Sequence, residues 1–247
     1  MNYDAVLSET IGLRGADDDL VEAYTARPLR PGPRGGVMMI HHMAGYDRES
    51  KEAVRRIAEM GYDTICVNLY HRDAPGASAA DAAAASRGRR GVPDDRLIGD
   101  LRGAARWLRD LPTSNGKVGC IGFCSGGRQA VMASMEIDLQ AVVDCYGAFI
   151  VAEPPADFPV DVTPLAQRLG EVGAPILAMS GNNDTHPSPQ QISEFEKLLR
   201  DNGKDIVVQL YDNAGHAFMS TDRSFYCVEA AVDAWRQAES FFGDKLS

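Results

Sequence analysis

The sequence has no long apolar run and no basic leader segment. None of its 247 residues belongs to an apolar stretch approaching the roughly 18 residues that a membrane-spanning helix needs. The first residues, up to Asp17-Asp18-Asp19, hold neither a basic segment nor an apolar one, so we expect no signal peptide. The sequence therefore predicts a cytoplasmic protein without membrane contact.

Basic residues are also in short supply. The chain has 25 Lys and Arg residues against 35 Asp and Glu residues, which leaves a net charge of −10. This excess of acid argues against nucleic acid as a partner. There is no CxxC pair, and an odd number of scattered cysteines fits reduced thiols better than a disulfide framework or a zinc site. The cysteines are Cys66, Cys120, Cys124, Cys145 and Cys227.

Short apolar runs do occur, and they alternate with helical patterns. The length and the hydrophobic content of 45% suit one large soluble domain, which we expect to cover 1–247. Continuous apolar strands between helices predict an α/β fold with a mostly parallel central sheet and helices on both faces. Ligands of such sheets bind at the carboxyl ends of the strands. The expected strands are 37–41, 64–69, 117–123, 141–146, 176–180 and 207–211; the expected helices are 50–60, 95–110, a segment after Cys124, 188–200 and 226–242.

One predicted strand ends in Gly122-Phe123-Cys124-Ser125-Gly126, directly before a helical pattern. This spacing is the G-x-nucleophile-x-G turn, with cysteine where serine is more common. Glycines two residues before and after the nucleophile relieve the collision that so tight a turn creates, and the following helix favours a thiolate. Ser125 fits less well as the nucleophile because Phe123 would then occupy a position that requires a small residue. The alternative is that Cys124 is a small core residue.

A nucleophile in this turn needs an acid and then a histidine later in the chain. His216 follows the last predicted strand in a Gly-His pair, and Asp184 lies in the loop after the strand at 176–180. His186 lies too close to that strand to serve as the base. Asp212 is the rival acid, although it is too near His216 in sequence to come from a different strand.

The oxyanion formed during acyl transfer needs two backbone N–H donors. We expect one from Ser125, directly after the nucleophile, and one from Met43 in the loop after an early strand. Two adjacent histidines precede Met43. We expect His41 to end the strand and His42 to face the cleft.

Several motifs together resemble the dienelactone hydrolase family of α/β-hydrolases. They are "HHMAGYDRESKE", "NLYHRDAPG", "NGKVGCIGFCSGG", "DCYG", "SGNNDTHPSP" and "YDNAGHAF", and they occur in the family's order across about residues 30–242. The resemblance implies an α/β-hydrolase fold and a triad of Cys124, Asp184 and His216. It also implies hydrolysis of a carboxylic ester or lactone.

The chain departs from the family pattern around the substrate. Family members that hydrolyse dienelactone keep a glutamate in the loop after the early strand, where it interacts with the resting thiol. The matching position here is His42, which either stabilises a thiolate or fills the pocket wall. Of the family's two carboxylate-binding arginines, one matches Arg72. The other would fall near Ser220, and Arg223 is displaced from that position. We also expect Tyr146 and Phe218, which lie in two of the motifs, to contact the substrate.

The predicted activity is therefore hydrolysis of a small-molecule ester or lactone through a thioacyl-enzyme, with no metal and no organic cofactor. Two alternatives stay open. The same triad could serve an acyltransferase or a thioesterase, or the chain could be a non-catalytic α/β-hydrolase-like binding protein with an unreactive Cys124. The sequence does not reveal an oligomeric state.

Overall fold

The computed structural model describes residues 5–222 and 224–247. The chain forms two compact units. The first comprises Met1–Gly119, Pro159–Asp161 and Leu246–Ser247, and the second comprises Cys120–Phe158 and Val162–Lys245. A single domain over 1–247 stays a prediction.

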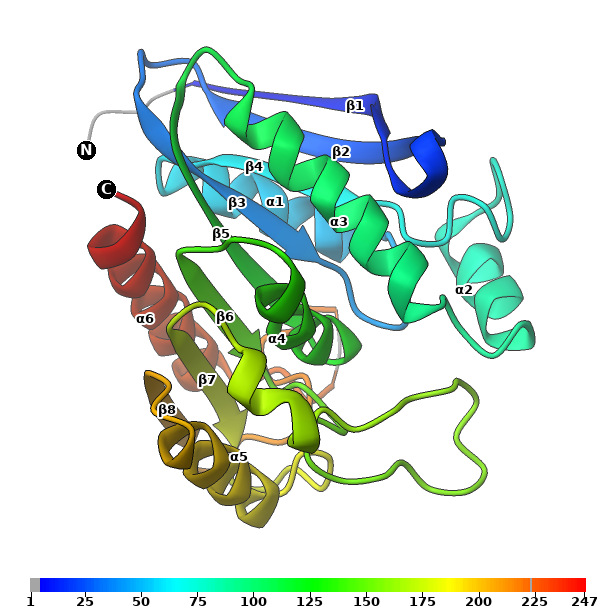
Figure 1. The fold of residues 1–247 in the computed structure, drawn as a ribbon, viewed down its shortest axis with the longest axis vertical. Coiled ribbons are helices and arrows are strands. Elements are labelled where there is room, and N and C mark those ends of the chain that lie inside the picture. Colours follow the sequence, from blue (N-terminus) through cyan, green and yellow to red (C-terminus); the bar gives the residue numbers. More distant parts are fainter. Residues whose placement is uncertain (1–4, 223) are drawn as a thin grey trace. The chain divides into compact units, whose positions relative to one another are not determined.

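The first unit holds four complete strands in the order β1-β2-β4-β3. Strands β1 and β2 pair antiparallel, as do β2 and β4, whereas β3 and β4 run parallel with Gly36 opposite Asp63. Within this unit, helix α3 lies in front of the strands and α1 behind them (Figure 1). The elements are β1 (Val6–Arg14), the 3-10 helix η1 (Ala16–Asp18), β2 (Leu20–Pro28), β3 (Arg34–Ile40), α1 (Arg48–Glu59), β4 (Asp63–Val67), α2 (Ala79–Gly88) and α3 (Asp94–Arg109).

Burial and helix capping explain why these residues of the first unit form strands and a helix. Every residue of β3 and β4 is buried, as expected for strands covered on both faces. Helix α1 begins at Asp47, whose carboxylate accepts the Ser50 N–H as an N-cap. Its inward face carries Val54 and Ile57, both fully buried. The Ser50 hydroxyl donates to the Gly45 carbonyl at 3.1 Å, which ties the loop between β3 and α1, with His42 and Met43, to the start of the helix.

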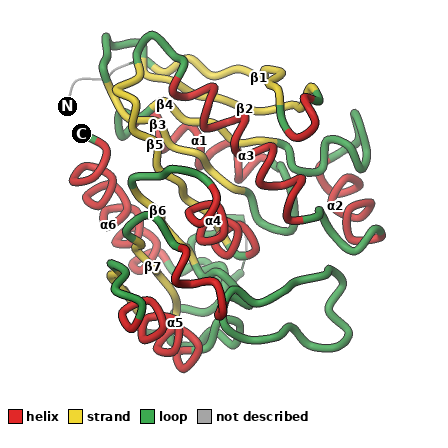
Figure 2. Tube along the Cα trace, viewed as in Figure 1, coloured by secondary structure: helices red, strands yellow, loops and turns green. Residues whose placement is uncertain are grey.

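The second unit is a parallel α/β sheet. Strand β5 enters it from the first unit, and the order continues β5-β6-β7-β8. Val142 lies opposite Ile176 and Ile176 opposite Ile206, so β6, β7 and β8 run parallel. Figure 2 shows the helices that separate these strands along the chain. The elements are β5 (Ser114–Phe123), α4 (Ser125–Glu136), β6 (Ala141–Cys145), the 3-10 helix η2 (Ala166–Glu171), β7 (Ile176–Gly181), α5 (Pro189–Asp201), β8 (Ile206–Tyr211) and α6 (Val228–Leu246).

The six strands and five helices expected from the sequence are all present, with ends shifted by a few residues. The hairpin of β1 and β2 was not expected. Because β6, β7 and β8 run parallel, the loops that follow them meet at the same edge of the second unit. No helix among the described residues is long and apolar enough to cross a membrane, and a cytoplasmic location stays a prediction.

Candidate active site

Cys124 occupies the sharp turn between β5 and α4. Its backbone has φ 56° and ψ −119°, a strained conformation for a residue with a side chain. The Cys124 N–H donates to the Cys145 carbonyl at 3.0 Å, which ties the turn to β6. A Cβ added at Gly122 would lie 1.9 Å from the Gly126 carbonyl oxygen, so the turn can form only with glycine there. This is the geometry that the sequence predicts for a nucleophile turn.

The helix after this turn faces the thiol with its positive end. Cys124 is the N-cap residue of α4, and Ser125 is the first helical residue. Unpaired N–H groups and the helix dipole stabilise negative charge at such a terminus. Cys124 is half-buried, whereas Cys66, Cys120 and Cys145 are fully buried. Among these cysteines, Cys124 is the one that combines access with an electropositive surrounding.

His216 links the thiol to a buried acid. Its Nδ1 atom lies 2.8 Å from Oδ2 of Asp184, and its ring is close enough to Cys124 for the two groups to interact electrostatically. Burial by itself lowers the pKa of His216, but the hydrogen bond to Asp184 and the interaction with Cys124 outweigh it and raise the pKa to about 10. The structure thus brings together the three residues that the sequence predicts as a triad, all within the second unit.

The loop after β7 fixes the carboxylate of Asp184. Its other oxygen, Oδ1, accepts the His186 N–H at 2.9 Å, so both oxygens are engaged. The Asn183 N–H donates to the Ala214 carbonyl at 2.9 Å, which joins this loop to the one that carries His216. Only 1% of the Asp184 side chain is exposed, against 36% of the His216 side chain. The acid is therefore shielded while the base stays accessible.

The rival residues have other partners. The carboxylate of Asp212 accepts a hydrogen bond from Asn182, and Asp212 is exposed. The ring of His186 is exposed and lies against Phe149, with centroids 5.4 Å apart. These contacts agree with the choice of Asp184 and His216.

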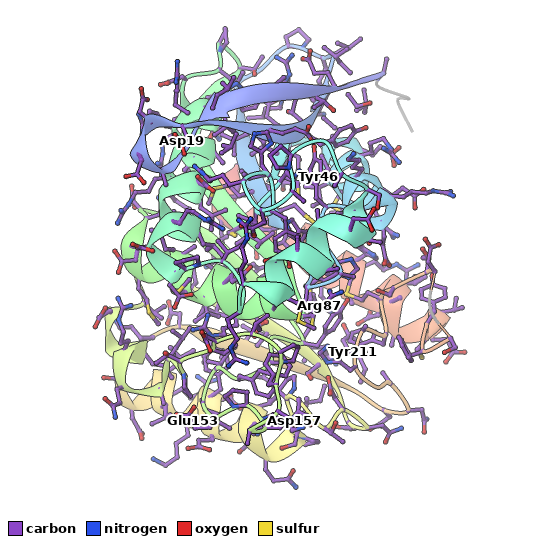
Figure 3. The ribbon with its side chains drawn as sticks, turned by 90° about the vertical axis from the view of Figure 1, so that its right-hand side faces the viewer. Asp19, Tyr46, Arg87, Glu153, Asp157 and Tyr211 are labelled. Carbon is purple, nitrogen blue, oxygen red and sulfur yellow. The ribbon has the colours of Figure 1, made fainter. Side chains whose placement is uncertain are left out.

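Tyr146, Phe218 and His216 form a chain of neighbouring rings, with Tyr146 in the middle. The Tyr146 ring meets the His216 ring edge-on, with centroids 5.4 Å apart, and meets Phe218 at the same distance. Phe218 also packs against Tyr211 (labelled in Figure 3). Tyr146 is 2% exposed and Phe218 is 0% exposed. Because these rings expose almost no surface, the structure does not support the expectation that they contact the substrate. Tyr146 packs against His216, and Phe218 packs against Tyr146.

The histidine pair lies in the first unit after β3. His41 is buried, donates from Nδ1 to the His42 carbonyl and accepts the Leu69 N–H at Nε2. Burial lowers the pKa of His41 to about 4, so it is neutral and structural. The Met43 carbonyl accepts the Tyr70 hydroxyl at 3.1 Å. Because Met43 and Cys124 belong to different units, the role of Met43 as an oxyanion donor stays a prediction.

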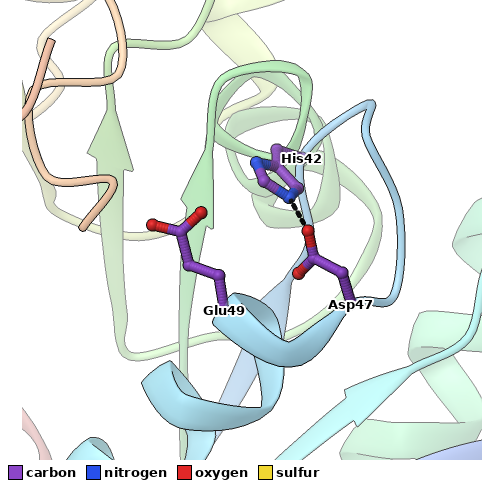
Figure 4. A group of neighbouring side chains, drawn as sticks. All are labelled: His42, Asp47 and Glu49. Atoms are coloured by element: carbon purple, nitrogen blue, oxygen red, sulfur yellow. Dashed lines mark hydrogen bonds and ion pairs between the residues drawn. The ribbon is translucent and has the colours of Figure 1, made fainter. Parts of the chain in front are cut away.

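His42 is paired with an acid. Its Nε2 atom lies 2.8 Å from Oδ2 of Asp47 (Figure 4). Burial alone raises the pKa of the Asp47 carboxyl, but hydrogen bonds from His42 and Ser50 bring it below the usual value. The sequence did not identify Asp47 as the partner of His42. A role of His42 beside the substrate stays a prediction.

His42, Asp47 and Glu49 also offer three atoms of a kind that bind metals, all within 4.8 Å of one another. Zinc bonds to nitrogen and oxygen are about 2.0–2.2 Å long. A metal would therefore require the group to close up and would break the His42–Asp47 hydrogen bond. Both oxygens of Asp47 already have partners, His42 and Ser50. The direct hydrogen-bonded pair accounts for this cluster, and we assign no metal to it.

Arg72 does not offer a free cation to a substrate. Its guanidinium binds the fully buried carboxylate of Asp100 at 2.8 and 3.0 Å, and its Nε donates to Asp19 (labelled in Figure 3) at 2.8 Å. The fork-shaped Arg72–Asp100 contact is a structural ion pair. The expectation that Arg72 binds a substrate carboxylate is therefore not supported. Ser220, at the position of the family's second arginine, is buried, and Arg223 lies outside the described residues.

Comparisons with known proteins agree with this geometry. A model described as "Dienelactone hydrolase family" matches residues 21–246. The carboxymethylenebutenolidase of Pseudomonas putida is 28% identical over 238 residues, covering 92% of each chain. A Yersinia pestis protein named for the same activity is 31% identical over 231 residues, which are 91% of this chain and 84% of the relative.

A solved structure of a Klebsiella pneumoniae protein assigned to the dienelactone hydrolases superposes with a TM-score of 0.84. The two sequences are 24% identical, and the superposition covers 97% of this chain and 99% of that one. This similarity confirms the α/β-hydrolase fold.

Proposed function

Because this chain belongs to the dienelactone hydrolase family, we propose that it hydrolyses a carboxylic ester or lactone through Cys124, His216 and Asp184. One observation carries the proposal: the His216 ring is hydrogen-bonded to Asp184 and lies close enough to Cys124 for that residue to raise its pKa. The chain is an ester or lactone hydrolase by family; the triad is our assignment.

The first half of the reaction acylates the enzyme. His216 holds the proton of Cys124, so the sulfur attacks the substrate carbonyl as a thiolate. The carbonyl oxygen becomes an oxyanion, which we assign to the Ser125 N–H because Ser125 is the first residue of α4. The tetrahedral intermediate collapses, the carbon–oxygen bond breaks, and His216 gives its proton to the leaving alkoxide. A thioester on Cys124 remains.

The second half releases the acid. His216, now neutral, takes a proton from water, and the resulting hydroxide attacks the thioester carbonyl. The carbon–sulfur bond then breaks, which frees the carboxylic acid and returns the thiolate beside protonated His216. Asp184 accepts the Nδ1–H throughout, so Nε2 is the nitrogen that exchanges protons.

We further propose that the substrate is a small molecule that does not need a carboxylate. Arg72 is the residue that the family pattern assigns to a substrate carboxylate, and here Asp100 and Asp19 occupy it. A neutral ester or lactone has no carboxylate, so its binding does not require Arg72.

The test measures hydrolysis of p-nitrophenyl acetate and δ-valerolactone by wild type, Cys124→Ala and Cys124→Ser. We expect turnover by wild type, none above background by Cys124→Ala, and a thioester of Cys124 visible by mass spectrometry after an acid quench. Full activity of Cys124→Ala would show that another residue is the nucleophile. Asp212→Asn, which changes the rival acid, is the matched control and should retain wild-type turnover.

A further inference from the structure

A second buried carboxyl lies behind the nucleophile turn, and the triad does not use it. Asp144, in β6, is 1% exposed. Its Oδ1 atom accepts the Gly147 N–H at 2.8 Å, and its Oδ2 atom has no hydrogen-bond partner among the described residues. Burying a carboxyl oxygen without a hydrogen-bond partner destabilises the folded protein. If position 144 served only for packing, an apolar residue would be more stable there.

The same carboxyl touches the first turn of α4. A Cβ added at Gly127 would lie 2.2 Å from Oδ1 of Asp144, and a Cβ added at Gly147 would lie 2.4 Å from it. Both positions therefore require glycine so that α4 can approach the loop after β6. Asp144 fills the junction between the helix that follows Cys124 and the loop that begins with Tyr146.

The residues on either side of this junction hold two members of the triad. The Cys145 carbonyl accepts the Cys124 N–H at 3.0 Å. Tyr146 has φ 46°, a strained backbone, and its N–H donates to the Met179 carbonyl at 2.7 Å. This conformation directs the Tyr146 ring to the edge-on contact with His216. The hydrogen bond from Gly147 to Asp144 closes the turn in which Tyr146 is strained.

We propose that Asp144 is a positioning residue of the hydrolase: through Gly147 and Tyr146 it fixes the His216 ring, and through Gly127 it fixes the turn that presents Cys124. The inference rests on the proposed function, because it assigns a purpose to groups around that triad. Asp144 touches no reacting atom. It sets the angle and distance between the base and the thiol, which are the quantities to which acyl transfer is most sensitive.

The electrostatics of the junction agree with this role. Burial raises the pKa of Asp144 to about 7, although the Gly147 hydrogen bond lowers it. Below about pH 7 the neutral carboxyl still accepts the Gly147 N–H and places no negative charge beside the α4 terminus that follows Cys124. An asparagine would reproduce this neutral acceptor, and an alanine would not.

The experiment compares Asp144→Asn and Asp144→Ala with Asp233→Asn. Asp233 is a half-buried carboxylate of the same unit that accepts the Tyr211 hydroxyl and lies outside the triad. With p-nitrophenyl acetate, we expect Asp144→Ala to lower kcat at least tenfold with KM within threefold of wild type. We expect Asp144→Asn to stay within threefold of the wild-type kcat, and Asp233→Asn to keep both constants.

Two further readouts separate this proposal from the proposed function. The rate at which iodoacetamide alkylates Cys124 and the NMR shifts of the His216 ring both report the geometry of the pair without any ester. If wild type turns over no ester or lactone, the proposed function fails. Positioning is still supported if Asp144→Ala slows alkylation and moves the His216 signals while Asp144→Asn does not.

Should Asp144→Ala fail to fold, Tyr146→Leu takes its place, since it removes the ring that contacts His216. We expect it to lower kcat at least tenfold with KM within threefold. The proposal is overturned if folded Asp144→Ala or Tyr146→Leu keeps the wild-type kcat and alkylation rate. It is equally overturned if Asp144→Asn is as impaired as Asp144→Ala.

Discussion

The Nδ1 atom of His216 lies 2.8 Å from Oδ2 of Asp184, and this bond decides which imidazole nitrogen faces Cys124. An amide at position 184 could donate to Nδ1 and so hold the ring in the wrong tautomer. For Asp184→Asn we expect kcat to fall by about 10³ to 10⁴, by analogy with the acid of other triads, while KM changes little. Steady-state kinetics on p-nitrophenyl acetate measure both constants. A loss below tenfold would show that Asp184 is not the acid.

The reactivity of Cys124 should show an unusual pH dependence. An ordinary histidine loses its proton as the pH rises through 6.5. Because the pKa of His216 is raised to about 10, its imidazole stays protonated between these two pH values. A protonated ring stabilises the thiolate over this interval, and an ordinary thiol with a pKa near 8.5 is largely protonated at pH 6.5. We expect wild type to react with iodoacetamide at pH 6.5 at least tenfold faster than His216→Gln.

The same comparison at high pH serves as its control. As the pH passes through 10 the His216 imidazole loses its proton and its effect on the thiol, so the two rates should converge. A wild-type rate that follows the His216→Gln profile at every pH would contradict the ion pair. Cys66, Cys120 and Cys145 are buried and should contribute no background in the folded protein.

Arg72 should matter for stability rather than for substrate choice. Only 17% of its side chain is exposed, and the side chain of its partner Asp100 is fully buried. Removing one partner of such a pair leaves a buried charge uncompensated, which destabilises by about 3 kcal/mol or more. We expect Arg72→Met to lose this much free energy of unfolding in urea. Its relative kcat/KM for lactones with and without a carboxylate should equal that of wild type. A selective loss for the carboxylate-bearing lactone would restore the substrate-binding role.

Gly122 should tolerate no side chain. The Cβ of Gly122→Ala would lie 1.9 Å from the Gly126 carbonyl oxygen, so the turn must deform. Overpacking of this kind costs about 1–3 kcal/mol, and the displaced Cys124 should lower kcat at least tenfold. Gly243→Ala is the matched control, because nothing lies within 4 Å of a Cβ there. It lies in α6, where alanine is the better helix former by about 1 kcal/mol. Thermal unfolding and ester kinetics would test both variants.

The sequence predicts a triad because each of its proposed members follows a buried strand. The apolar runs before Cys124, Asp184 and His216 are short and continuous, and parallel strands bring the residues that follow them to one edge. The order along the chain then assigns a role to each residue. The prediction rests on local patterns that the fold does not override.

Other features depend on contacts that no local pattern reveals. Arg72 looks like a free cation in sequence, but its partners Asp19 and Asp100 lie 53 and 28 residues away. The hairpin of β1 and β2 escapes prediction because most of β1 is exposed and lacks an apolar run. Tyr146 and Phe218 were expected to contact the substrate, whereas the structure buries both rings, with Tyr146 against His216 and Phe218 against Tyr146. Periodicity locates a ring near a site but does not tell whether its face meets a ligand or another ring.

A thiolate that is nucleophilic enough to attack a carbonyl also reacts readily with peroxides. Peroxides oxidise ionised, accessible cysteines first, to a sulfenic acid and then irreversibly beyond it. Cys124 is accessible and lies near His216, which the proposed mechanism makes its ion-pair partner, while three of the other four cysteines are buried. We expect dilute hydrogen peroxide to inactivate the enzyme in step with a mass gain of one or more oxygens on Cys124. Prompt addition of dithiothreitol should reverse only the first stage. If the turn at Cys124 supplies the nucleophile, it also makes the lifetime of the protein depend on the redox state of its surroundings.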